Sequence, residues 1–295
     1  MGSLVNVLGA GRSGSTILGL MLGNAPDAFY CGEVYAWFRP YRAHHFSIKC
    51  TCKRDPCPYW ENIKALPENR FHAKVLEQLK VDFVMDSSKD LPWVLDNNRW
   101  AAENGIDVIN LLLYKNPVDL AYSHWKRGRG LVHWRKVFLR WYGRYFQSGL
   151  PYVSVRHADL ARHAAEKLEQ ICCVIGMEYF PGKEKFWEKE HHHLFGSQGV
   201  RKRLEQTNSP RDRYATDLPA EFREKIPLIR SMLEQEPQIL NLMEKLEEAE
   251  ISHRGSQHGE RTASCPRKSY PIWYYVAKMK RRFKRYFPEP WPYDQ

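Results

Sequence analysis

The N-terminal segment constrains the fold of this chain more than any other feature. A mostly apolar run, Leu4–Leu8, leads into a glycine-rich turn, Gly9–Gly14, and then into a helix start at Ser15-Thr16-Ile17-Leu18. Backbone N–H groups at such a turn, together with the N-terminus of the following helix, point at one place and can hold an anion, usually a phosphate. The segment therefore predicts an α/β protein with an anion site at its first turn.

Three more apolar runs predict buried strands, at Phe83–Met85, Val108–Tyr114 and Tyr152–Val155. Segments with helical spacing lie between them, and this alternation favours a parallel sheet with helices on both faces. We therefore expect a P-loop-like α/β fold with a basic C-terminal extension. Ligands of such sheets bind at the carboxyl ends of the strands. The polar turns after the four runs should line one crevice, namely Gly9–Thr16, Asp86–Lys89, Lys115–Pro117 and Arg156–Asp159.

The chain has 295 residues and is 43% hydrophobic, which is sufficient for one large core. Residues 219–249 are expected to form one or two helices, interrupted near Pro227 and Pro237. Residues 251–270 are polar and rich in Gly, Ser and Arg, which is typical of a linker. We expect a domain at 1–250, a linker at 251–270 and a tail at 271–295.

Charge and hydropathy favour a cytoplasmic location. No run of 18 apolar residues occurs, and no basic segment followed by an apolar signal region opens the chain. The seven cysteines are accordingly expected to be mostly reduced thiols. The formal charge of +11 is uneven, because residues 251–295 hold ten basic and three acidic residues. The small positive excess of the remaining residues suits an anionic ligand without identifying it.

The tail shows helical spacing of apolar residues with basic residues between them. The apolar positions are 272, 275, 276, 279, 283, 286 and 287. Such a helix can lie on an anionic membrane surface, which would make the protein membrane-associated. Alternatively, its apolar face packs on the domain and its charges are solvated.

The glycine-rich turn also fits two other phosphate-binding patterns. Gly9, Gly11 and Gly14 match the dinucleotide fingerprint of oxidoreductases, with Glu33 at the place of its acidic partner. However, Ala28–Gly32 is expected to make a poor second strand. The turn has Walker A spacing as well, but Ser15 replaces the required lysine. A nucleic-acid-binding protein would use the basic tail, and this hypothesis leaves the turn without a role.

Several motifs in order resemble those of sulfotransferases that use 3′-phosphoadenosine 5′-phosphosulfate (PAPS). Arg12-Ser13-Gly14-Ser15-Thr16 resembles their 5′-phosphosulfate loop. Lys115, followed by Pro117 and by Ser123 eight residues after the lysine, resembles their 3′-phosphate motif. Asp86-Ser-Ser-Lys89 is similar to a turn of many bacterial members, and Cys31-Gly-Glu33 is similar to a segment of tyrosylprotein sulfotransferases. The resemblance covers about residues 1–245.

This resemblance implies a set of roles. Ser13, Gly14, Ser15 and Thr16 would bind the 5′-phosphate of PAPS, while Lys115, Ser123 and Arg127 would bind its 3′-phosphate. Arg201, in a segment similar to the loop that closes over the nucleotide, is a further candidate for the 3′-phosphate. Glu33 would be the catalytic base, with Arg12 and Lys89 stabilising negative charge. No catalytic metal is expected.

The acceptor is expected to carry a hydroxyl group, and we favour a glycan or glycolipid. A protein tyrosine is the alternative, although Tyr35 stands where the tyrosylprotein enzymes carry an arginine.

Three cysteines, Cys50, Cys52 and Cys57, resemble a cysteine-bearing insertion of the bacterial group. With His44 and His45 they can bind zinc, but their spacing is poor for it, and packing or a redox pair are the alternatives. The run His191–His193 is expected to be loop surface or packing, since nothing fixes a fourth ligand.

Overall fold

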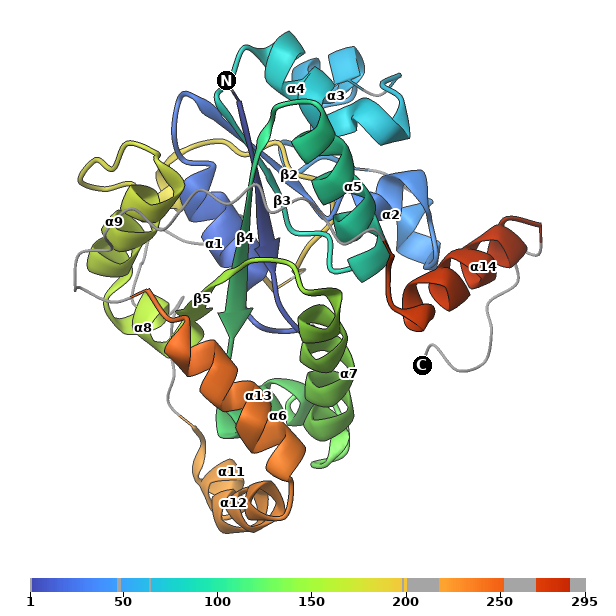
Figure 1. Cartoon of the computed structure of the whole chain (residues 1–295). Helices are drawn as coiled ribbons and strands as arrows, with labels where there is room; N and C mark the ends of the chain where they lie inside the picture. The colour runs from blue at the N-terminus through green and yellow to red at the C-terminus, as the bar shows by residue number, and fades with distance from the viewer. Residues whose placement is uncertain are drawn as a thin grey trace.

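A five-stranded parallel sheet forms the centre of the computed structural model (Figure 1). The structure describes residues 2–46, 49–63, 65–197, 199–200, 218–251 and 269–286. The strands are β1 (Ser3–Leu8), β2 (Ala28–Gly32), β3 (Phe83–Asp86), β4 (Asp107–Tyr114) and β5 (Val153–Arg156). Their order across the sheet is β2-β3-β1-β4-β5. The predicted α/β class, with a parallel sheet between helices, is confirmed.

Strand β2 corrects the sequence analysis, in which Ala28–Gly32 was expected to make a poor strand. Its residues are all buried, and Phe29, Tyr30 and Cys31 suit a strand that lies under covering side chains. The dinucleotide-binding hypothesis is instead weakened by strand order. In that fold the second strand lies beside the first, whereas here β3 lies between β1 and β2.

Helices cover both faces of the sheet and extend past its end (Figure 1). Many of them follow a strand directly, so their N-termini lie at the carboxyl ends of the strands. The described helices are α1 (Ser15–Leu22), α2 (Tyr35–Phe38), α3 (Pro58–Ile63), α4 (Phe71–Leu79), α5 (Leu91–Glu103), α6 (Pro117–Trp125), α7 (His133–Ser148), α8 (His157–Arg162), α9 (Ala164–Ile175), α11 (Ala220–Arg223), α12 (Ile226–Glu234), α13 (Pro237–Glu248) and α14 (Ile272–Tyr286).

Side chains alternate along β1 between two apolar cores. Val5 and Val7 face α1 and α9, whereas Leu4 and Leu8 face α5 and α7. Asn6 lies in the middle of β1 and is also buried. Its amide donates to Asn98 at 2.7 Å and to Asn110 at 3.0 Å, so this buried polar group is satisfied within the core.

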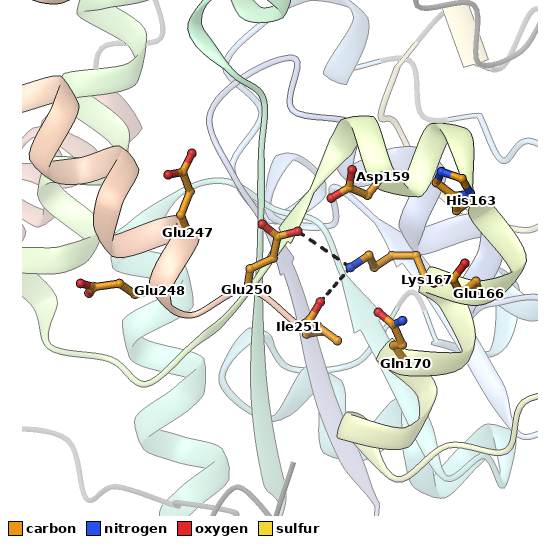
Figure 2. Close-up of a pocket in the computed structure, with 9 residues that line it drawn as sticks. All are labelled: Asp159, His163, Glu166, Lys167, Gln170, Glu247, Glu248, Glu250 and Ile251. Atoms are coloured by element: carbon orange, nitrogen blue, oxygen red, sulfur yellow. Dashed lines mark hydrogen bonds and ion pairs between the residues drawn. The ribbon is translucent and has the colours of Figure 1, made fainter. Parts of the chain in front are cut away.

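The end of α13 is fastened to the sheet by a buried ionic cluster (Figure 2). Lys167 on α9 donates to the Ile251 carbonyl at 2.7 Å and lies 3.8 Å from Glu250. These residues line a cavity of about 480 Å³. Burial raises the pKa of Glu250, and a hydrogen bond with Asp159 raises it further. The cluster holds Ile251 beside β5, where its N–H donates to the Ser154 carbonyl at 3.2 Å.

The tail helix α14 contacts helix α5 of the domain. Tyr270, just before α14, and Tyr274 are buried against Leu95 of α5, and the Tyr274 hydroxyl donates to Asp96. The predicted apolar residues of α14 face solvent, because Ile272 is 81% exposed and Met279 is 56% exposed. The expectation that they pack on the domain is therefore wrong for the residues described. In the same residues, no helix has the length and apolar character needed to span a bilayer.

Candidate active site

A cavity of about 1070 Å³ opens at the carboxyl ends of the strands. Each of the five strands contributes a side chain to its wall from the turn that follows it. These side chains are Arg12, Glu33, Lys89, Lys115 and His157. The structure thus brings the predicted turns together in one site, as the parallel sheet requires.

The turn after β1 has the backbone that its glycines predict. Gly14, the N-cap of α1, has a φ of 106°, and a side chain there would collide with the ring of His157. Ser13, Ser15 and Thr16 are buried. Among the described residues, neither the Ser13 hydroxyl nor the Arg12 Nε has a hydrogen-bond partner, although both atoms are buried. Buried polar groups are normally paired, so these two atoms fit an anionic ligand.

Lys115, just before α6, contacts Ser123, which lies within α6. The Lys115 Nζ donates to the Ser123 Oγ at 3.2 Å, and that hydroxyl donates to the Asp119 carbonyl at 2.9 Å. Burial, together with the neighbouring Lys126, lowers the pKa of Lys115 to about 8. The predicted partners in the 3′-phosphate motif are therefore adjacent, and the charge of Lys115 lies near the cations Lys126 and Arg12, with Asp119 as an opposing carboxylate.

The same excess of positive charge acts on the first turn. Burial lowers the pKa of Arg12 to about 10, with Arg127 as the next cause, while Glu33 opposes the shift. Arg127 itself is exposed and lines the cavity. Clustered cations repel one another, and an anion with several negative oxygens would relieve that repulsion. Arg201 lies outside the described residues.

Glu33 and Lys89 form an ion pair that lines the same cavity. The Lys89 Nζ donates to the Glu33 Oε1 at 2.6 Å, and both side chains are partly exposed. The Glu33 N–H donates to the Leu194 carbonyl at 3.0 Å, and Trp141 donates to the Lys89 carbonyl at 3.0 Å. Both backbones are thereby fixed, while the charged ends reach the cavity.

Asp86 has a structural role. It accepts hydrogen bonds from His72, Trp93 and the Ser88 N–H, at 2.9, 2.8 and 2.6 Å. Burial alone would raise the pKa of this carboxyl, but these donors hold it below its ordinary value. The network shapes the turn that presents Lys89.

His157 lies in the predicted turn after β5, and burial lowers its pKa to about 3, with Lys115 and Lys126 adding to the shift. Sequence reasoning missed other parts of the cavity wall. These are Arg140 of α7 and both Ala277 and Lys280 of α14. These helices lie far apart in sequence and share no motif, so only the fold brings them to the site.

The three cysteines lie beside this site and meet a histidine. Cys50, Cys52, Cys57 and His192 place one ligand atom each within 4.8 Å of one another. His44 is exposed and does not join them. His192, from the run expected to be loop surface or packing, thus lies among the three cysteines.

No family model matches the sequence, and a search of curated proteins finds no match. Several solved structures are distantly similar. The sulfotransferase domain from the curacin biosynthetic pathway shows 14% identity and a TM-score of 0.43, covering 79% of this chain and 98% of that one. The Alicyclobacillus acidocaldarius sulfotransferase shows 13% identity and a TM-score of 0.40, covering 84% of this chain and 96% of that one. A mouse sulfotransferase complexed with PAP shows 10% identity and a TM-score of 0.38, covering 84% of this chain and 89% of that one. These likenesses are too distant to assign an activity, so the residues of the cavity must carry it.

Proposed function

We propose that this protein transfers a sulfuryl group from PAPS to a hydroxyl group of an acceptor. One observation carries the proposal. A cavity at the carboxyl ends of a parallel sheet is lined by a phosphate-type turn, a cation cluster and the Glu33–Lys89 ion pair. The turn and the cations suit a donor with two phosphate groups, and the ion pair suits proton transfer beside a developing charge.

PAPS, when bound, supplies an activated sulfuryl group attached to its 5′-phosphate. Ser13, Gly14, Ser15 and Thr16 would hold the 5′-phosphate, since they form the turn and the N-terminus of α1. Lys115, Ser123 and Arg127 would hold the 3′-phosphate. Arg201 remains a proposed further ligand of that group.

Sulfuryl transfer resembles phosphoryl transfer, in which catalysis consists mainly of positioning and charge stabilisation. Glu33 would accept the proton of the acceptor hydroxyl as that oxygen bonds to sulfur. Lys89 would stabilise the sulfuryl oxygens, and Arg12 would stabilise the charge left on the 5′-phosphate as the old O–S bond breaks. The products would be a sulfate ester and adenosine 3′,5′-bisphosphate. We assign no metal to these steps.

For the acceptor we favour a glycan or glycolipid over a protein tyrosine. Tyr35 and Tyr41 line the cavity, and aromatic rings suit the binding of sugars. Tyr35 also occupies the place of the arginine in the tyrosylprotein enzymes, which weakens that alternative. A cytoplasmic protein attached to the membrane surface through α14 would suit a lipid-linked acceptor.

The rival hypotheses explain fewer of these residues. A dinucleotide-dependent oxidoreductase gives no role to Lys115 or Lys89, and a nucleic-acid-binding protein gives none to the first turn. We accordingly consider nucleic acid an unlikely partner.

Thermal unfolding with added ligand tests the donor assignment. Adenosine 3′,5′-bisphosphate at 100 times its Kd should stabilise the protein by about 2.7 kcal/mol, and NAD should have no effect. Incubation with labelled PAPS and an extract of source cells should then identify what acquires sulfate. Stabilisation by NAD alone would contradict the proposal.

A further inference from the structure

Cys50, Cys52, Cys57 and His192 form a compact group of soft ligands outside the catalytic cavity. Cys50 and Cys57 are each 6% exposed, and the His192 side chain is 11% exposed. Three thiols and an imidazole that converge in a closed place are the ligand set of structural zinc sites.

The two distances from the imidazole to the cysteines are close to those around a tetrahedral ion. The His192 Nδ1 lies 3.5 Å from the Cys57 Sγ and 4.0 Å from the Cys50 Sγ. A zinc ion with bonds of about 2.3 Å to sulfur and about 2.0 Å to nitrogen separates such ligand atoms by about 3.5 Å. The four side chains therefore need only small shifts to bind zinc.

The surroundings of His192 orient its ring for this role. Its other nitrogen, Nε2, lies 3.4 Å from the Glu190 carboxylate, which in turn pairs with Arg54 at 2.6 Å. Histidines that bind metals commonly donate their second N–H to a carboxylate, which fixes the tautomer. The Trp60 indole also donates to the His192 carbonyl, and the Tyr59 ring lies 4.2 Å from the His192 ring. This aromatic cover closes the group on one side.

We propose that Cys50, Cys52, Cys57 and His192 bind one structural Zn²⁺ ion. The ion joins two segments that are distant in sequence, the loop before α3 and the segment 190–194. The segment 190–194 also fixes the backbone on both sides of Gly32. The Leu194 N–H donates to the Cys31 carbonyl at 2.9 Å, and the Leu194 carbonyl accepts from the Glu33 N–H. Zinc thus stabilises the backbone that presents Glu33, without contacting substrate.

Metal analysis of the purified full-length protein tests the site independently of its activity. We expect one zinc per chain, and none after substitution of Cys57→Ser or Cys52→Ser. Cys173→Ser is the matched control, since that cysteine is exposed on α9 and stands apart from the group. Glu190→Gln should weaken zinc binding by about 10- to 100-fold while the four ligands remain.

Substitution of Co²⁺ for zinc in the wild-type protein tests the metal site even if the cysteine variants fail to fold. The wild-type protein with Co²⁺ should show the intense visible bands of a tetrahedral ion and the near-ultraviolet bands of thiolate bonds. A wild-type protein that contains no zinc after expression with added zinc, and gives no such spectrum, would overturn the proposal. A disulfide among the three cysteines, found by alkylation and mass spectrometry of the freshly purified protein, would also overturn it. Neither result bears on the donor site, whose binding of adenosine 3′,5′-bisphosphate is measured separately.

Discussion

Two sets of groups in the active-site cavity are built in different ways. We call the groups proposed to bind phosphate the donor end; they come from the turn after β1 and from the segment 115–127 that holds α6, and most of them are buried. We call the cavity side chains of α2, α7 and α14, together with the exposed Tyr41, the acceptor end, because we propose that the acceptor contacts them. The sheet and α6 fix the donor end, whereas separate helices assemble the acceptor end. The proposed chemistry links the two at Glu33 and Lys89, which line the same cavity.

The largest expected effect is at this meeting point. Glu33→Gln should reduce turnover by about 10²- to 10⁴-fold, because the variant cannot accept the acceptor proton. Its affinity for adenosine 3′,5′-bisphosphate should stay unchanged, since Glu33 is not among the groups proposed to bind phosphate. Turnover with labelled PAPS and a calorimetric titration measure the two quantities.

Glu103→Gln, at the exposed end of α5, is the matched control and should leave both quantities unchanged. If Glu33→Gln keeps the wild-type rate, another group is the base. His124 would then be the next candidate, since it lines the cavity and burial lowers its pKa to about 4. Asp86 is unsuited, because its oxygens already accept three hydrogen bonds.

At the donor end, Arg12→Ala and Lys115→Ala should each weaken binding of adenosine 3′,5′-bisphosphate. Each removes a charge-assisted contact of about 1.5–3 kcal/mol, which corresponds to roughly a 10- to 150-fold rise in Kd. Calorimetric titration of the folded variants measures the change. Arg162→Ala, an exposed cation of α8 outside the cavity, is the control. Unchanged affinity in both cavity variants would contradict the donor site.

A smaller effect follows from the titration of Lys115. Its pKa of about 8 means that the unliganded protein loses this charge as pH rises through 8. The phosphate is already ionised there, since its second pKa is about 6. The Kd for adenosine 3′,5′-bisphosphate should therefore rise between pH 7 and pH 9, by up to about tenfold per pH unit above the pKa.

Lys115→Arg retains its charge over this range and should show a flatter profile. Identical profiles for the two proteins would show that another group titrates.

The contrast between the two ends also explains what could be predicted from sequence. The donor residues could be found because each lies in a short motif after an apolar strand, and a parallel sheet brings such turns together. Strand β2 was missed because its five residues include Gly32 and lack a run of β-branched side chains, although burial and pairing with β3 favour the strand. Propensity gives way to tertiary context in such short elements.

The acceptor wall and the histidine that joins the three cysteines could not be predicted for a different reason. Arg140, Ala277 and His192 belong to segments whose own patterns show only a helix or a loop. Their roles depend on contacts between positions more than 100 residues apart, such as the pairing of Cys57 with His192. Patterns within a short segment of sequence do not indicate which distant segments it contacts.

The smallest expected effect concerns α14, which completes the acceptor end. Ile272, Tyr275, Val276 and Met279 share one exposed helix face, and Lys280 is exposed beside them. We expect the intact protein to co-sediment with anionic vesicles at low salt, and a chain ending at Ile251 to lose this binding while still binding adenosine 3′,5′-bisphosphate. Lys280→Gln should weaken vesicle binding only about fivefold, because one basic residue near an anionic surface contributes about 1 kcal/mol. Arg230→Gln, an exposed cation of α12, is the control. Equal sedimentation of the intact and shortened chains would show that α14 contributes to the cavity wall and not to membrane binding. Loss of folding in the shortened chain would show that the contacts between α14 and α5 belong to the core.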